Sequence, residues 1–149
     1  MRKLIPILML VLAATTAVGV PSVLRKSGDC KLAVGDMFED KKVFTVELAN
    51  PDVQLTCKFR GGDFFGEFTV FANPSISNKS GKKLMVSYNV AFFDKAGELI
   101  ACAKQSGDMD ATAKNHQFGS CMSKLSQEEF AKIAAYKVVV YVSEPVKKK

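Results

Sequence analysis

Apolar and polar residues alternate along most of the chain beyond residue 43, with the two-residue period that places successive side chains on opposite faces of a β-strand. The longest alternation runs over 84–93, where Leu84 and Phe92 lie in one phase and Met85 lies in the other. Further strands are expected over 44–48, 53–60, 64–72, 98–104, 116–121 and 137–142. The pattern therefore predicts a chain made mainly of β-strands.

The inward phase of these strands defines the predicted core. Between its members lie polar residues such as Thr56, Lys58 and Arg60, which we expect to face water. The predicted core consists of Phe44, Val46, Leu55, Phe59, Phe68, Val70, Val86, Tyr88, Val90, Phe92, Val138 and Val140.

The sequence Asp94-Lys95-Ala96-Gly97 separates two apolar stretches and predicts a tight turn between two strands. Asp94 suits the first position of a type I turn, and Gly97 suits a position with positive φ at the start of the returning strand. The strands before and after this turn are therefore expected to form a hairpin.

Polar loops are expected at 73–75, 78–81 and 105–115. Ser126 and Glu129 have the spacing of a capping box, which predicts a helix of about ten residues that buries Phe130, Ile133 and Ala134.

The regular spacing of strands and turns predicts the fold class. We expect an all-β, immunoglobulin-like antiparallel β-sandwich of about seven strands, with one short helix before the last strand. A closed barrel is the alternative architecture.

The N-terminus has the pattern of an export signal: Arg2 and Lys3, an apolar run over 4–12, and then small residues. Cleavage after Gly19 is expected, and cleavage after Ala17 is the alternative. An uncleaved anchor over 4–24 is also long enough to span a bilayer. The predicted organisation is a signal peptide at 1–19, a linker at 20–29, one domain at 30–145 and a basic tail at 146–149.

The formal charge of +6 falls to +4 if Arg2 and Lys3 leave with the signal. The remaining lysines are spread along the chain, with small clusters at 41–42, 82–83 and 147–149. Nucleic-acid surfaces interleave basic residues with exposed aromatic ones. Here the aromatic residues fall on apolar faces, so we expect no nucleic-acid partner.

Four cysteines, an even number in a chain expected to be exported, predict disulfides. Cys30 and Cys57 both lie in inward phases, and Cys102 and Cys121 lie at the two ends of one short excursion. We therefore expect the pairs Cys30–Cys57 and Cys102–Cys121. Reactive thiols are the alternative, and His116 is the only histidine that could activate them.

No residue set points to catalysis or to a metal or cofactor site. His116 lies near Ser120 and Ser123 in sequence, but the chain has no Gly-x-Ser-x-Gly elbow. The acidic residues lack the spacing of a calcium loop and are expected to be solvated; they are Asp36, Glu39, Asp40, Asp108 and Asp110. Asn78-Lys79-Ser80 is a glycosylation sequon, which matters only in a eukaryotic source.

The stretch Val90-Ala91-Phe92-Phe93-Asp94, together with Ala72-Asn73-Pro74-Ser75 and the turn at Gly97, resembles FxLYD-type domains of exported bacterial proteins. Asp94 is the identical position of the family motif, and the resemblance covers 64–142. It implies an immunoglobulin-like sandwich in a cell-envelope or secreted setting, and it supplies no catalytic residues.

These observations predict a non-enzymatic, secreted or periplasmic interaction or structural module. Its expected partner is another protein or a cell-envelope component, with membrane contact only if the N-terminal segment stays uncleaved. The alternative is a small hydrolase or an enzyme inhibitor that acts through the sandwich loops, of which 105–115 is the longest predicted.

Overall fold

The computed structural model describes residues 21–34, 43–64, 66–119 and 121–145. The expected signal peptide, the acidic residues Asp36, Glu39 and Asp40, and the basic tail lie outside this part of the chain.

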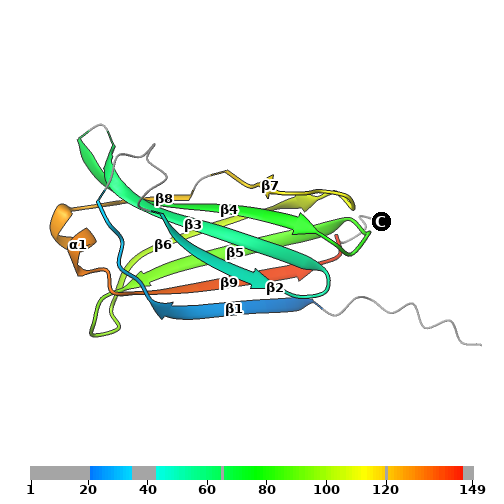
Figure 1. Ribbon diagram of the computed structural model, residues 1–149, viewed down its shortest axis with the longest axis horizontal. Helices are drawn as coiled ribbons and strands as arrows, with labels where there is room; N and C mark the ends of the chain where they lie inside the picture. The colour runs from blue at the N-terminus through cyan, green and yellow to red at the C-terminus, as the bar shows by residue number, and fades with distance from the viewer. Residues whose placement is uncertain (1–20, 35–42, 65, 120, 146–149) are drawn as a thin grey trace, which may run out of the picture.

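The described residues form two antiparallel sheets, which confirms the predicted all-β sandwich (Figure 1). The four-stranded sheet has the order β1-β9-β5-β6, and the five-stranded sheet has the order β2-β3-β4, with both β7 and β8 paired to β4. The strands are β1 (Ser22–Asp29), β2 (Phe44–Ala49), β3 (Val53–Phe64), β4 (Glu67–Asn78), β5 (Leu84–Phe93), β6 (Leu99–Met109), β7 (His116–Gln117), β8 (Cys121–Leu125) and β9 (Ala135–Ser143). The single described helix, α1 (Gln127–Lys132), precedes the last strand, as predicted.

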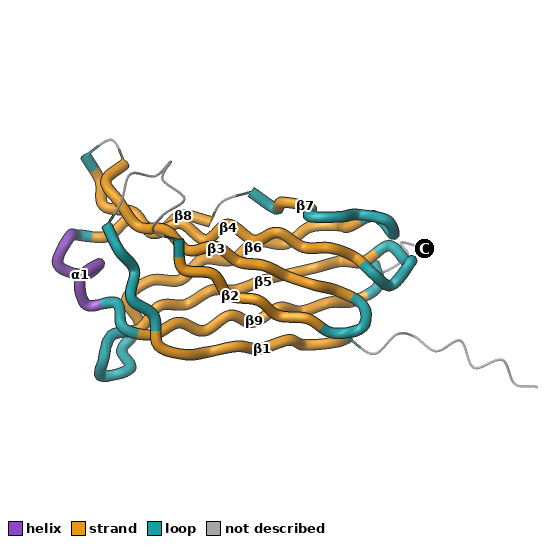
Figure 2. The backbone as a smooth tube through the Cα atoms, in the orientation of Figure 1, coloured by secondary structure: helices purple, strands orange, loops and turns teal. Residues whose placement is uncertain are grey.

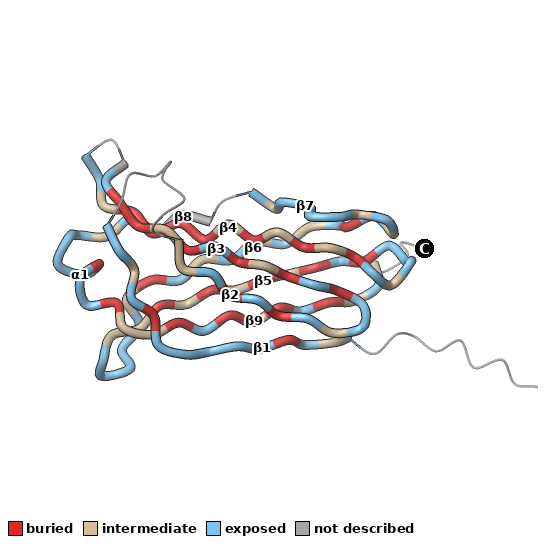
Figure 3. Tube along the Cα trace, viewed as in Figure 1, coloured by how far each residue is buried: buried red, intermediate tan, exposed pale blue. Residues whose placement is uncertain are grey.

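Alternation of apolar and polar residues places one face of each sheet in the core. Along β5 every second residue from Leu84 to Phe92 is buried, and the same alternation is visible along β9 and β3 (Figure 3). All predicted core residues are buried except Phe44 and Phe68, which are half-buried and pack against the core. The predicted inward phase is therefore confirmed.

Aromatic rings join the two sheets across the core. Phe59 of β3 contacts Phe92 of β5 edge to face, with ring centroids 5.1 Å apart. Tyr136 of β9 lies 5.8 Å from Phe59 and 5.4 Å from Phe44 of β2. These four rings thus link both strands of the first hairpin in one sheet to two neighbouring strands of the other.

The predicted turn between β5 and β6 is confirmed in its details. The Asp94 carboxylate oxygen Oδ1 accepts hydrogen bonds from the backbone N–H groups of Ala96 (2.8 Å) and Glu98 (2.9 Å). Gly97 has φ of 84° and donates its N–H to the Asp94 carbonyl (3.1 Å). A glycine is favoured there because side chains with a Cβ rarely adopt positive φ.

The capping box is confirmed, but the helix has six residues instead of about ten. Ser126 and Glu129 bond reciprocally, and Phe130 is buried. The helix ends at Lys132, with Ile133 as its C-cap, because the next residue already bonds to the sheet: the Ala134 N–H donates to the Phe93 carbonyl (2.8 Å), and the Ala134 carbonyl accepts from the Cys30 N–H (2.9 Å). Figure 2 shows the helix and the β5–β6 turn together at one end of the sandwich, opposite the end reached by β9.

Residues 22–29, predicted as a linker, instead form the edge strand β1, which pairs with β9 from Ser22–Val142 to Asp29–Ala135. The alternation was not evident in the sequence because Leu24 is the only buried residue of this strand. Lys26 lies on the same face of β1 as Leu24, but its Nζ donates to the carbonyl oxygen of Glu47 on β2 (3.1 Å).

Two polar stretches predicted as loops instead lengthen predicted strands. The described chain has nine strands rather than about seven because β1 is added and one predicted strand is divided in two. Residues 73–75 lie within β4, and residues 105–109 lie within β6. The predicted strand at 116–121 is divided into β7 and β8, which pair with β4 on either side of Pro74. Proline is tolerated in a strand where the ladder of hydrogen bonds is interrupted.

We predict that Gly61→Ala lowers the free energy of unfolding by about 1–3 kcal/mol, because over-filling a packed core forces side chains out of place. A Cβ at position 61 would lie 2.0 Å from Cε2 of the buried Phe130 ring. Urea denaturation measures the change.

Gly28→Ala is the matched control, because a Cβ at position 28 meets its nearest atom, on the Tyr136 ring, at an ordinary contact distance of 3.5 Å. Equal losses in the two variants would contradict the idea that the Phe130 ring restricts position 61.

Candidate functional site

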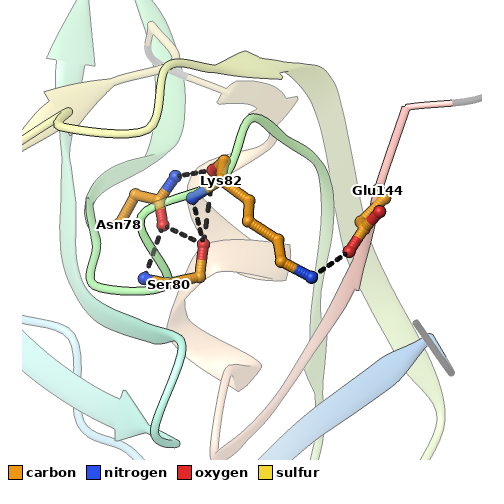
Figure 4. Close-up of polar contacts among 4 residues, drawn as sticks. All are labelled: Asn78, Ser80, Lys82 and Glu144. Atoms are coloured by element: carbon orange, nitrogen blue, oxygen red, sulfur yellow. Dashed lines mark hydrogen bonds and ion pairs between the residues drawn. The ribbon is translucent and has the colours of Figure 1, made fainter. Parts of the chain in front are cut away.

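A network of polar side chains lies at the end of the sandwich where β9 finishes (Figure 4). At its centre Asn78, the last residue of β4, donates from Nδ2 to the carbonyl oxygens of Lys82 (2.7 Å) and Asp110 (2.9 Å). Its Oδ1 accepts from the backbone N–H (3.0 Å) and the hydroxyl (2.7 Å) of Ser80. One amide side chain thus connects the β4–β5 loop to the loop that follows β6.

This network determines whether the Asn78-Lys79-Ser80 sequon can be glycosylated in the folded chain. Asn78 is 7 % exposed, and its Nδ2, the atom that a glycan would modify, already donates both hydrogens to backbone carbonyls. In the folded chain Asn78 therefore serves as a structural junction.

Beside this junction, Lys82 forms an ion pair with Glu144 just beyond β9, with Nζ and Oε1 2.8 Å apart. The hydrogen bond to the Glu144 carboxylate raises the pKa of Lys82. The pair borders a cavity of about 160 Å³ that Ser22, Asp52 and Ser80 also line. Such a volume holds a few water molecules, so this end is better explained as a joint between loops than as a binding site.

A larger hollow of about 500 Å³ lies on the outer face of the five-stranded sheet, and we call it the β3–β4 groove. Its floor consists of cross-strand pairs: Thr56 opposite Ser75, and Lys58 opposite Asn73. The complete lining is Thr56, Lys58, Arg60, Asn73, Pro74, Ser75, Asn115 and Gln117.

The groove lies beside the gap between β7 and β8, the two short strands that pair with β4. β7 pairs with Ser75 and Ile76, and β8 pairs with residues 68–72. The rim is held by Asn115, whose φ of 49° lies in the left-handed region that asparagine tolerates better than most residues. Its N–H donates to the Ser77 hydroxyl (3.0 Å), and that hydroxyl donates to Asn115 Oδ1 (3.3 Å).

The chemistry of the groove is cationic and polar. Lys58 is exposed and Arg60 is half-buried, and the other lining side chains carry hydroxyls or amides apart from Pro74. The described lining contains no acidic and no aromatic residue. This set of donors suits anionic groups and backbone amides, and it lacks a nucleophile with a paired general base.

The predicted candidates for chemistry are dispersed. His116 is exposed, and its ring lies edge-on to Phe118 at 4.8 Å. Ser123 donates its hydroxyl to the Cys102 carbonyl (3.1 Å), and Ser120 lies outside the described residues. Asp108 pairs with Lys83 (3.1 Å).

Two further features are absent from the described residues. No group of three or more histidine, cysteine or acidic side chains within them could hold a metal ion. In the same part of the chain, no helix has the length and apolar character needed to cross a bilayer.

The cysteines occupy different environments. Cys30 and Cys57 are buried in the core, and Cys102 is exposed on β6. No disulfide joins these three residues in the structure, and the side chain of Cys121 lies outside the described part. The hydrogen bond from the Ser123 hydroxyl to the Cys102 carbonyl places β8, which carries Cys121, beside β6. The pairs Cys30–Cys57 and Cys102–Cys121 stay predictions.

Comparison with known proteins assigns no family. No family model matches the chain, and no curated protein matches it. Similar solved structures include the crystal structure of a DUF1425 family member from Shewanella sp. pv-4, with 16 % identity and a TM-score of 0.36. That similarity covers 81 % of this chain and 99 % of the other.

We predict that Asn78→Ala lowers the free energy of unfolding by about 1–3 kcal/mol, because it removes a buried amide that donates two hydrogen bonds and accepts two. The carbonyls of Lys82 and Asp110 would lose their donor. Asn89→Ala, at a half-buried site on the outer face of the other sheet, is the control and should change stability little. Equal effects in urea denaturation would argue against the junction.

We predict that, in reduced protein, iodoacetamide alkylates Cys102 well before Cys30. Burial, with the neighbouring Asp29 carboxylate as a smaller cause, raises the pKa of the Cys30 thiol to about 11. Because the thiolate is the reactive form, alkylation of Cys30 should increase only as the pH rises toward that value.

Peptide mass mapping after timed alkylation measures both rates, and mapping of unreduced protein tests the disulfide pairs. Faster alkylation of Cys30 than of Cys102 at neutral pH would contradict the burial of Cys30. A Cys57–Cys102 bond would contradict the predicted pairs.

Proposed function

We propose that this protein is a non-enzymatic binding module that acts after export, in the cell envelope or as a secreted protein, and that its partner binds in the β3–β4 groove. The observation that carries the proposal is the groove itself, a hollow of about 500 Å³ lined by cationic, amide and hydroxyl side chains on a sheet. Sites on regular strands hold their side chains in more fixed positions than sites on loops.

The proposal favours binding over chemistry because the reactive residues lie apart. Ser123 donates its hydroxyl to a backbone carbonyl, and His116 contacts an aromatic ring. The loop that the hydrolase or inhibitor alternative required is also shorter than expected, because residues 105–109 belong to β6. The groove lies on the outer face of β3 and β4, and of that predicted loop only Asn115 lines it.

Export is supported by the N-terminal pattern of Arg2 and Lys3, an apolar run and small residues. The resemblance to FxLYD-type domains implies the same compartment. Both remain predictions, and the expected N-terminus of the mature chain is Val20.

Site-specific photocrosslinking in the native host tests the proposal. A benzophenone amino acid in place of Ser75, in the groove, should yield a discrete crosslinked product in the secreted or envelope fraction. The same amino acid in place of Ser87, a half-buried serine on the outer face of the four-stranded sheet, is the matched control.

A product from position 75 and not from position 87 would support the groove as the partner site. Equal products from both positions, or none from position 75, would contradict it. Recovery of the protein only from the cytoplasm would contradict the proposed compartment.

A further inference from the structure

The β3–β4 groove changes from neutral to cationic along the direction of its strands. Thr56, Ser75 and Gln117 form a neutral row across β3, β4 and β7. The next row consists of Lys58 paired with Asn73. Because alternate residues of a β-strand repeat at about 6.6–6.8 Å, the ammonium group belongs to a row one such step beyond the hydroxyl and amide groups.

The side chains of both rows are available to a ligand. Among the described residues, no hydrogen bond or ion pair engages the side chains of these rows, which are Thr56, Lys58, Asn73, Ser75 and Gln117. Arg60, two residues further along β3, already interacts within the chain. In the described lining, Lys58 is therefore the cation that a ligand can engage.

The neutral row suits the backbone of an extended polypeptide. Hydroxyl and carboxamide groups both donate and accept hydrogen bonds, as each peptide group requires. Residues of an extended chain repeat at about 3.3 Å, so two of them span the step between the rows. A chain that follows the strands with a peptide group over Ser75 thus places a group two residues later at Lys58.

The single available ammonium suits a chain that carries one charge at its end. A polypeptide has this order, because neutral peptide groups precede its C-terminal carboxylate. Proteins that bind single-stranded nucleic acids instead combine a positive groove that follows the whole backbone with aromatic side chains on which bases stack. The described lining contains no aromatic residue. The groove therefore favours a terminal carboxylate over a nucleic acid.

We propose that the β3–β4 groove binds the extended C-terminus of a partner protein, with the terminal carboxylate at Lys58 and the preceding peptide groups over Ser75 and Gln117; this inference rests on the proposed function. Lysine acts on the carboxylate as a point charge, and the neighbouring Asn73 amide can donate a further hydrogen bond. Because Lys58 is exposed, the preference for the charged end weakens as salt is added.

NMR titration of the exported protein with three acetylated peptides of about six residues, long enough to span both rows, tests the position of the charge. The first peptide repeats Thr-Ala and ends in a free carboxylate. The second has the same sequence and ends in an uncharged amide. The third also ends in the amide but has a glutamate in place of its central threonine.

The peptide with the free carboxylate should bind about fivefold more tightly than the other two, which is the upper end of the effect of one exposed charge pair. Its binding should also shift the backbone amide signals of Lys58 and Asn73.

Variants separate the contact with the charge from the contacts with the backbone. Lys58→Gln should make the free-carboxylate and amide peptides bind alike. Gln117→Ala should weaken both by a similar factor and keep the preference, because Gln117 belongs to the neutral row. Lys137→Gln is the matched control: Lys137 is an exposed strand lysine on the outer face of the other sheet, and its replacement should leave all affinities unchanged.

Equal affinities for the free-carboxylate and amide peptides, or a preference that survives Lys58→Gln, would overturn the inference. Equally tight binding of the peptide with the internal glutamate would overturn its terminal specificity. Absence of peptide binding together with specific crosslinking from position 75 would overturn the inference and leave the proposed function in place. Loss of both signals would instead reject the groove as a partner site.

Discussion

Contact between the inner faces of the two sheets is the constraint on which the other features depend. Phe59, Phe92 and Tyr136 meet across the core, and their rings set which face of β3, β5 and β9 points inward. Once Leu55, Cys57 and Phe59 are inward, the residues between them must be outward, because side chains alternate along a strand. The position of Lys58 on the outer face is therefore a consequence of packing in the core.

The two polar regions of the molecule differ in the space around their side chains. Around Asn78 the amide makes four hydrogen bonds to neighbouring loops, and the network has little capacity left for a ligand. In the β3–β4 groove the side chains line open space beside an interrupted strand. A saturated network stabilises a fold, whereas side chains that line an open groove can contact a partner.

Sequence alone predicted the elements whose signals are local. The long alternation of β5, the Asp94–Gly97 turn and the Ser126–Glu129 capping box depend on neighbouring residues, and each was found as expected. Elements held by distant partners were missed. β1 has a single buried residue, and it is a strand because β9 pairs with it.

The groove was missed for a related reason. Its β3 residues were expected to face water. Asn73-Pro74-Ser75 suggested a loop, so the sequence did not place these residues beside the outward residues of β3. A signal was present: Asn73 and Ser75 alternate with Ala72 and Ile76, which are buried. The proline outweighed that alternation in the prediction, although the gap between β7 and β8 accommodates it.

Lys26 has a consequence for how copies of this chain behave toward one another. β1 and β2 are edge strands of the described sheets, and such edges expose backbone groups that can template fibrils. Lys26 occupies one of these groups, the Glu47 carbonyl, and places an ammonium at the seam between the edges. A strand from another copy would have to displace and dehydrate that charge before it could add to the sheet. A lysine at this position therefore disfavours edge-to-edge pairing of two copies through β1 and β2.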